Sequence, residues 1–195
     1  MMSCIRGALR AAVPLAAALL ISACGGVPLG WDQPASSLHD INLLTRYGTA
    51  IQTPALSKDW RKGLEQEIQS RNLLNAQDVM IIEQRLLRGG ASMAATLASV
   101  HFLPSAFGVS KRHRGVEVIV IDSGLYQSRQ PDMFFFQNGR LIGWYYTTMD
   151  NNGNVHRTSN GQTFNIDDFE VTPCQKLGDS PCSGLQIPRL ASATQ

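Results

Sequence analysis

Apolar residues recur at helical spacing in the stretch that follows Ser57, and this pattern predicts three helices. The first helix has Ser57 as its N-cap, the second starts after Asn75 and stops at the glycine pair 89–90, and the third starts at Ser92. The apolar stripes of the three helices are Trp60, Leu64 and Ile68; Val79, Ile82 and Leu86; and Met93, Leu97 and Val100.

The pattern then changes to short runs of β-branched and aromatic residues. Residues 116–121, 133–136 and 141–147 are predicted strands. The second and third of them flank Asn138-Gly139, and this dipeptide favours the tight type I′ turn of a hairpin. A weaker second hairpin leads into residues 155–158.

Helices followed by an antiparallel meander predict an α+β fold, with two or three N-terminal helices packed on a small sheet of three to four strands. We divide the chain into a signal peptide (1–23), a tether (24–56), the α+β domain (57–150) and an irregular C-terminal extension (151–195). The tether is rich in Gly, Pro and Ser, and it includes a short predicted helix near residues 38–47.

The N-terminus has the order of charged, apolar and small residues that is typical of a secretory signal. Arg6 and Arg10 precede an apolar run over 11–21, which is too short for a membrane-spanning helix of roughly 20 residues. Residues 21–24 (Ile-Ser-Ala-Cys) resemble a bacterial lipobox, which implies cleavage before Cys24 and attachment of lipid to its thiol. The alternative is an ordinary secretory signal with a chance cysteine.

Cleavage before Cys24 would lower the formal net charge of the chain from +2 to zero. The full sequence has 17 basic and 15 acidic residues; the signal contains two arginines and no acid, so 15 of each remain. A nucleic-acid partner is not expected, because phosphate binding needs a concentrated excess of Lys and Arg. The acyl chains would anchor the protein to a membrane. Lipoproteins of this type that lack Asp just after the lipidated cysteine commonly go to the outer membrane. Because Gly25 stands at that position, the resemblance to this class implies the outer membrane, with the protein facing the periplasm.

Cysteine usage agrees with an oxidising compartment. Cys4 leaves with the signal and Cys24 takes the lipid, so Cys174 and Cys182 remain as a predicted disulfide pair. These two thiols, with no CxxC motif and no nearby histidine, do not supply the four ligands of a structural zinc site. We therefore expect no metal and no cofactor.

The order helix, Gly-x-Ser, helix, Pro, strand and hairpin resembles the SmpA/OmlA family of small outer-membrane lipoproteins over about residues 78–144. One member of this family is an accessory subunit of the β-barrel assembly machinery. The shared features are Gly90-Ala91-Ser92 at a helix start and the aromatic strand, Asn-Gly-Arg turn and apolar strand of residues 134–141. The chain departs from the family at Ala91, where the family has Met, and at His101, where it has Gly. The resemblance implies two helices on a three-stranded antiparallel sheet that is used for protein contact without catalysis.

Motifs for catalysis or metal binding are weak. Asp150, Asn152 and Asn154 occupy the first positions of a calcium loop, but Val155 stands where that loop needs Gly, so a turn is the better interpretation. The acidic run at 167–170 is interpreted as a solvated loop. No nucleophile elbow or phosphate loop occurs, and we do not expect an enzyme; an envelope enzyme remains a rival hypothesis.

The candidate partner-binding residues are aromatic and basic. Strand alternation places Tyr145 on one sheet face and Trp144 and Tyr146 on the other, and one face must meet the helices. The face left over would expose aromatic side chains, which often mark interfaces. A basic run before the first strand could contact anionic lipid or an acidic partner. The predicted partner-binding residues are Phe135, Trp144, Tyr145, Tyr146, Lys111, Arg112 and Arg114.

These features predict a lipid-anchored envelope protein that binds another envelope protein, in assembly or maintenance of the outer membrane. One alternative is a lipoprotein that binds a small ligand or lipid in a cavity lined by residues such as Met93, Leu97, Val118 and Val120. The other is a lipoprotein component of a secretion system, which the sequence does not separate from the first hypothesis.

Overall fold

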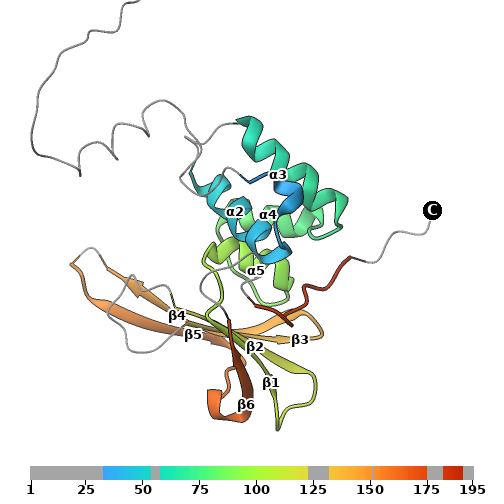
Figure 1. Cartoon of the computed structure of the whole chain (residues 1–195). Helices are drawn as coiled ribbons and strands as arrows, with labels where there is room; N and C mark the ends of the chain where they lie inside the picture. Colours follow the sequence, from blue (N-terminus) through green and yellow to red (C-terminus); the bar gives the residue numbers. More distant parts are fainter. Residues whose placement is uncertain (1–32, 54–57, 123–131, 151, 175–181, 191–195) are drawn as a thin grey trace, which may run out of the picture.

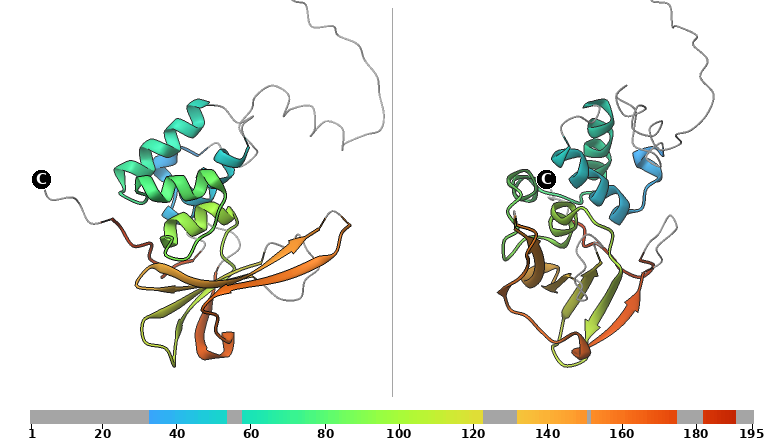
Figure 2. Two further views of the ribbon diagram at one scale, coloured as in Figure 1. Left: turned by 180° about the vertical axis from the view of Figure 1, so that it is seen from behind. Right: turned by 90° about the vertical axis from the view of Figure 1, so that its left-hand side faces the viewer.

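The computed structural model describes residues 33–53, 58–122, 132–150, 152–174 and 182–190. In this part of the chain, four α-helices lie on one face of a six-stranded antiparallel sheet (Figures 1 and 2). The predicted α+β class is confirmed. The predicted count of three to four strands is wrong, and so is the count of two or three helices.

The helices are η2 (Ala35–Ser37), α2 (Asp40–Gln52), α3 (Lys58–Ser70), α4 (Ala76–Gln84) and α5 (Met93–Val100). Two of the helices, α4 and α5, begin at side-chain caps that the sequence predicts, whereas α2 begins after His39 without a side-chain cap. In the second predicted helix, the Asn75 side chain accepts a hydrogen bond from the Asp78 N–H, and the Asp78 carboxylate accepts one from the Asn75 N–H. In the third, the Ser92 hydroxyl accepts a hydrogen bond from the Ala95 N–H. The predicted cap Ser57 lies outside the described residues.

The prediction of a tether over residues 24–56 is wrong where helix α2 forms. Part of the segment assigned to a tether forms this 13-residue helix, and its Ile41, Leu44 and Tyr47 are buried in the main core. It packs against α5 so closely that a Cβ atom at Gly48 would overlap the carbonyl group of Ala98. The predicted short helix near residues 38–47 is therefore real, but it belongs to the domain and is one of its central elements.

The sheet has the strand order β5-β4-β3-β2-β1-β6, and every neighbouring pair is antiparallel. β1 and β6 are not among the predicted strands, and the prediction of an irregular extension after residue 150 is wrong for β5 and β6. Both missed strands are only five residues long; β6 is exposed at all but its first residue, and β1 is only partly buried. The strands are β1 (Ala106–Ser110), β2 (Val116–Ile121), β3 (Asp132–Gln137), β4 (Arg140–Met149), β5 (Val155–Gly161) and β6 (Phe169–Pro173).

The β3–β4 hairpin has the predicted turn and one unpredicted bulge. Asn138 and Gly139 both have positive φ angles, of 52° and 70°, as a type I′ turn requires. Phe136 pairs with Leu141 and Phe135 with Gly143, so Ile142 is an extra residue in β4. The bulge places both Leu141 and Trp144 on the helix side of the sheet, although their spacing alone predicts opposite faces.

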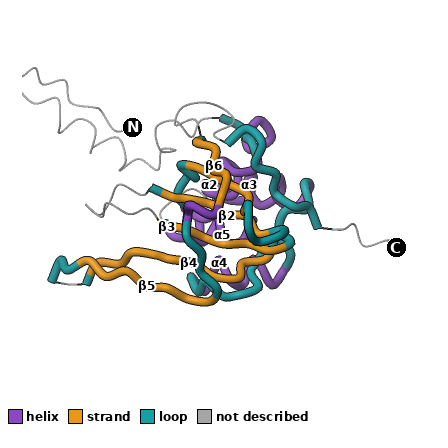
Figure 3. Tube along the Cα trace, turned by 90° about the horizontal axis from the view of Figure 1, so that it is seen from below, coloured by secondary structure: helices purple, strands orange, loops and turns teal. Residues whose placement is uncertain are grey.

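The second face of the sheet is also covered. After β5 the chain crosses to the other edge of the sheet before it forms β6 (Figure 3). Phe164 and Ile166 from this crossing, together with Phe169 at the start of β6, pack on Val118 and Phe135. The sheet therefore separates two apolar clusters, a large one with the helices and a small one with the crossing segment.

The end of the described chain returns to the helices. Cys174 and Cys182 form a disulfide, as predicted, with their Cα atoms 4.4 Å apart. Leu185 and Ile187 are then buried in the main core. The Arg189 guanidinium donates to the Asp40 carboxylate and to the Arg71 carbonyl, each at 2.8 Å. This segment thus joins the disulfide at the end of β6 to the helical layer.

Alanine substitution of Gly48, with Gly63 as the matched control, tests the close packing of α2 against α5. Gly48→Ala is expected to destabilise the protein by about 1–3 kcal/mol, because the added methyl group overpacks the contact with Ala98. Gly63→Ala, in the open middle of α3, has no atom within 4 Å of the new Cβ, and it should instead stabilise by about 0.5–1 kcal/mol. Urea unfolding of both variants measures the difference. Equal effects would contradict the packing described for α2.

Candidate functional site

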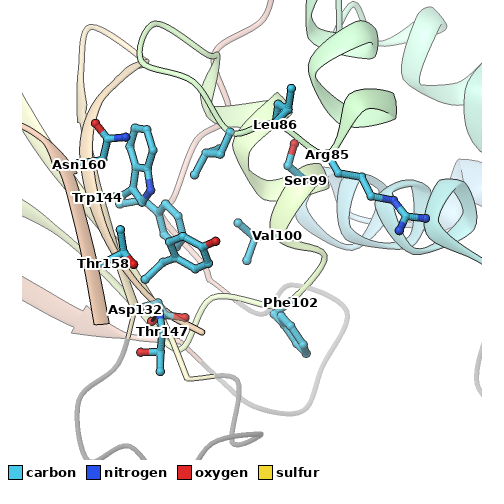
Figure 4. Close-up of a pocket in the computed structure, with 13 residues that line it drawn as sticks. Arg85, Leu86, Ser99, Val100, Phe102, Asp132, Trp144, Thr147, Thr158 and Asn160 are labelled. Atoms are coloured by element: carbon cyan, nitrogen blue, oxygen red, sulfur yellow. Dashed lines mark hydrogen bonds between the residues drawn. The ribbon is translucent and has the colours of Figure 1, made fainter. Parts of the chain in front are cut away.

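A groove opens between the helical layer and the strands at one side of the sheet (Figure 4). Its volume is about 440 Å³. The helix side supplies residues that follow α4 and residues at the end of α5, and the sheet side supplies residues of β3, β4 and β5. The large apolar residues that line it are Leu86, Leu87, Val100, Phe102, Phe134, Trp144 and Tyr146.

The helix side of the groove results from the early end of α4. Arg85 adopts a left-handed conformation with φ 53° and caps the helix, so Leu86 and Leu87 leave the helical path. The prediction that Leu86 lies on the buried stripe of this helix is wrong, since its side chain is 51% exposed at the groove. His101 ends α5 in the same way, and its Nδ1 lies 2.9 Å from the Gln52 side-chain nitrogen.

Two cross-strand residue pairs of β4 and β5 contribute to the sheet side of the groove. Trp144 of β4 lies opposite Asn160 of β5, and Tyr146 lies opposite Thr158. All four residues line the groove, so this is the face of β4 and β5 that looks toward the helices. Trp144 is buried, whereas the Tyr146 ring is 40% exposed. The groove is therefore more enclosed at Trp144 and more open to solvent at Tyr146.

The groove contains two polar groups of interest. Burial raises the pKa of the Asp132 carboxyl, and hydrogen bonds from Thr147, including its N–H at 2.8 Å, offset part of that rise. The Ser99 hydroxyl oxygen is buried, and no hydrogen-bond partner for it lies among the described residues. A ligand that entered the groove could supply such a partner.

The structure separates the aromatic residues that were predicted to bind a partner. Trp144 and Tyr146 contribute to the groove, as just described. Phe135 is fully buried on the opposite face, with Phe164 at a ring-centroid distance of 5.3 Å, and the prediction that it contacts a partner is wrong. Tyr145 also lies on that opposite face, where it is half-buried. Sequence alternation assigned the faces correctly, but it did not indicate that the crossing segment covers Phe135.

A second hollow lies on that opposite face, beside the same outer strand. It has a volume of about 540 Å³ and is lined by Met133, Tyr145, Arg157, Phe164 and Ile166, together with Thr163 and Asn165. The Arg157 guanidinium lies 4.6 Å from the centroid of the Tyr145 ring. Arg157 is the one charged residue among those that line this hollow.

The predicted basic run lies at the turn between β1 and β2 (Figure 1), and none of its residues lines the groove. Arg112 forms a salt bridge of 3.0 Å with Asp168, and the Lys111 N–H donates to the Asp168 carbonyl at 2.8 Å. Lys111 and Arg114 are exposed. The acidic run that was interpreted as a separate solvated loop therefore meets the basic run, and part of the positive charge expected to face a partner is balanced within the fold.

The cavity that the sequence suggested for a small ligand, lined by Met93, Leu97, Val118 and Val120, does not form. Met93 and Leu97 are buried in the core between helices and sheet. Val118 and Val120 lie in the cluster on the opposite face. Because the sheet separates the two pairs, they do not line one cavity.

The described residues contain no group of three or more His, Cys, Asp or Glu side chains placed to hold a metal ion. In the same part of the chain, no helix is long and apolar enough to cross a membrane. The predicted lipidation site Cys24 lies outside the described residues.

No family model, curated protein or solved structure matches the chain. The resemblance to the SmpA/OmlA family therefore remains a prediction from the motifs that carry it.

The hydrogen bonds of the Asp150 carboxylate in the turn before β5 predict that the stability of this turn depends on pH. Its carboxylate accepts hydrogen bonds from the Asn154 side chain at 3.0 Å and from the N–H groups of Asn152 and Asn154 at 2.9 Å each. These bonds, with that of the Asn154 side chain the largest cause, lower the pKa of Asp150 to about 2. The turn interpretation of this motif explains these contacts without calcium.

Because the folded pKa lies below the ordinary value of 3.8, the turn is stabilised above that pH and loses this stabilisation as the pH falls toward 2. We expect Asn154→Ala to raise the pKa of Asp150, and Asn152→Ala to leave it nearly unchanged, because Asn152 donates through its backbone. A carboxyl-carbon NMR titration measures both. The same pKa in the two variants would contradict this assignment.

Proposed function

We propose that the protein is a lipid-anchored component of the cell envelope and binds another envelope protein through the groove. The lipobox-like residues 21–24, the balanced charge of the chain after Cys24 and the resemblance to small outer-membrane lipoproteins support this proposal. On this basis it would act as an assembly accessory, at the periplasmic side of the outer membrane.

The observation that carries the proposal is the exposure of large apolar side chains at the mouth of the groove. Leu86 and Tyr146 come from opposite walls, and both are exposed to solvent. Large apolar groups that remain exposed together are typical of surfaces that bind another molecule. An aromatic floor at Trp144, with apolar walls beside it, matches the composition of the centre of a protein interface.

The position of the domain in the chain is compatible with a lipid anchor. Leu38 is the first buried residue of the described chain, and 14 positions separate it from Cys24. A segment of that length reaches at most about 50 Å when fully extended. An anchored domain would thus stay close to the membrane surface.

A small ligand is the second candidate occupant. The volume of the groove, about 440 Å³, lies within the roughly 300–1,000 Å³ that is common for small-molecule sites. The experiment on the groove separates the two hypotheses, since a small ligand would leave no protein crosslink.

Crosslinking in intact cells tests the proposal. A photoreactive amino acid in place of Leu86 should capture one specific envelope protein. Tyr146→Ser should reduce the capture severalfold, because it removes a large exposed side chain that lines the groove. Val109 is the matched control: it is 52% exposed, similar to Leu86, but lies in β1 and does not line the groove. Equal capture from both positions, or none from Leu86, would contradict a protein-binding groove.

The lipid anchor has its own test. Cys24→Ser should abolish incorporation of labelled palmitate and release the protein from the membrane fraction, because the thiol is the predicted attachment point. Cys4→Ser, within the predicted signal, should leave both unchanged. Palmitate labelling of Cys24→Ser at the level of the unmodified protein would exclude this residue as the anchor.

A further inference from the structure

One side-chain amide ties α2 to α5 behind the helix wall of the groove. The Gln52 side chain, at the end of α2, places its nitrogen 3.2 Å from the Ser99 carbonyl oxygen and 2.9 Å from Nδ1 of His101. A carbonyl oxygen only accepts, so the nitrogen donates one of its two hydrogens to Ser99 and has the other for His101. Nδ1 of His101 therefore accepts, which makes the ring neutral with its proton on Nε2.

Residues next to this bridge line the groove. Ser99 and Phe102, which stand on either side of His101, both belong to the helix wall (Figure 4). The Phe102 ring stacks on the His101 ring, with the two centroids 4.8 Å apart. At the end of α4, Arg85 donates to the backbone carbonyl of Gln52 at 3.3 Å, and the exposed leucine that follows Arg85 also lines the groove. A change at His101 would therefore reach both parts of the helix wall.

Protonation of His101 is incompatible with the bridge. A proton on Nδ1 would face an N–H of Gln52, and two donors do not form a hydrogen bond. If the Gln52 amide turned over, its oxygen would face the ring but would also oppose the Ser99 carbonyl oxygen. That carbonyl oxygen lies 3.4 Å from Nδ1 as well. The protonated ring would thus take the Ser99 carbonyl for itself and release Gln52, which leaves α2 without its tie to α5.

The surroundings of His101 favour the neutral ring. Burial lowers the pKa of His101 below its ordinary value of 6.5; the Ser99 carbonyl opposes this shift, and the positive charge of Arg85 adds to it. Arg85 and Asp132, which lies on the sheet wall, are the charged residues that line the groove. Because the folded pKa lies below 6.5, the bridged state is present above that pH and is lost as the pH falls through the folded pKa.

We propose that His101 makes partner binding depend on pH: with a neutral ring, Gln52 ties α2 to α5 and the groove binds its partner, and with a protonated ring the tie breaks and the partner is released. This inference rests on the proposed protein-binding function and adds its regulation. By linkage, the bound partner also weakens proton binding at His101, since both equilibria share one coupling free energy.

NMR on the full-length protein in detergent tests the response of the groove without a partner. The His101 ring, identified by its absence in His101→Asn, should show the Nε2–H tautomer at neutral pH and a pKa below 6.5. In protein labelled with fluorotryptophan, the fluorine signal of Trp144, identified with Trp144→Phe, should shift over the same pH range, because Trp144 lines the groove. His101→Asn should remove that shift.

His101→Asn is the matched variant because asparagine tolerates the left-handed backbone at this position, where φ is 53°, and offers Gln52 an acceptor that does not titrate. In membranes that carry the photoreactive residue at position 86, capture should fall at least about fivefold between about pH 8 and about pH 5. His101→Asn should abolish the fall, and His113→Asn, at the β1–β2 turn outside the groove, should keep it.

Gln52→Met lacks the bridge at every pH and should give the low capture of the acidic state throughout. Melting curves of the variants confirm that each is folded, and the tautomer measurement on the unmodified protein needs no variant.

Four outcomes would overturn the proposal: an Nδ1–H tautomer at neutral pH, a Trp144 signal that does not follow His101, capture that is independent of pH, or an equal fall in His101→Asn. The last outcome would assign the pH dependence to another group, with Asp132 as the first candidate. If Leu86 captures its protein while the NMR tests fail, the protein-binding function stands and only its regulation is rejected. If nothing is captured at either pH while the Trp144 signal follows His101, the groove responds to pH and the protein-binding function is rejected.

Discussion

The contact between α2 and α5 is the constraint on which the rest of the structure depends. Gly48 lets α2 approach the backbone of α5 at Ala98, and α5 in turn lies between α2 and the sheet. The end of α5 then places Ser99 and Val100 on one wall of the groove. A larger residue at position 48 would move α5 away from α2, and the wall of the groove would move with it. The geometry of the site is therefore set by a glycine that lies in a different helix.

The face of the sheet opposite the helices is partly covered by the segment between β5 and β6. The crossing from β5 to β6 places Phe164 and Phe169 over Phe135, and the salt bridge between Arg112 and Asp168 ties this crossing to the β1–β2 turn. The disulfide and the segment after it connect the β6 edge to the helices. The groove and the second hollow both lie beside β5, whose outer side is not paired by another strand of the described chain.

Much of the local structure was predictable because it depends on neighbours in the sequence. The caps at Asn75 and Ser92 and the Asn138-Gly139 turn have the predicted roles, since each needs only a side chain and a backbone group a few positions away. The early end of α4 at Arg85 was missed, because helical spacing continues to Leu86 and a left-handed non-glycine residue has no sequence signal. The groove was missed with it, since its helix side begins at that turn.

The sequence by itself determined the α+β class, the order of helices and strands, the central hairpin, the cysteine pair and the separation of Tyr145 from Tyr146. All of these follow from local periodicity, turn chemistry or the count of cysteines. Only the tertiary structure decided that α2 belongs to the core, that β1 and β6 extend the sheet, and that the segment between β5 and β6 covers Phe135. These features arise from contacts between residues far apart in the chain, whose pairing no local pattern records.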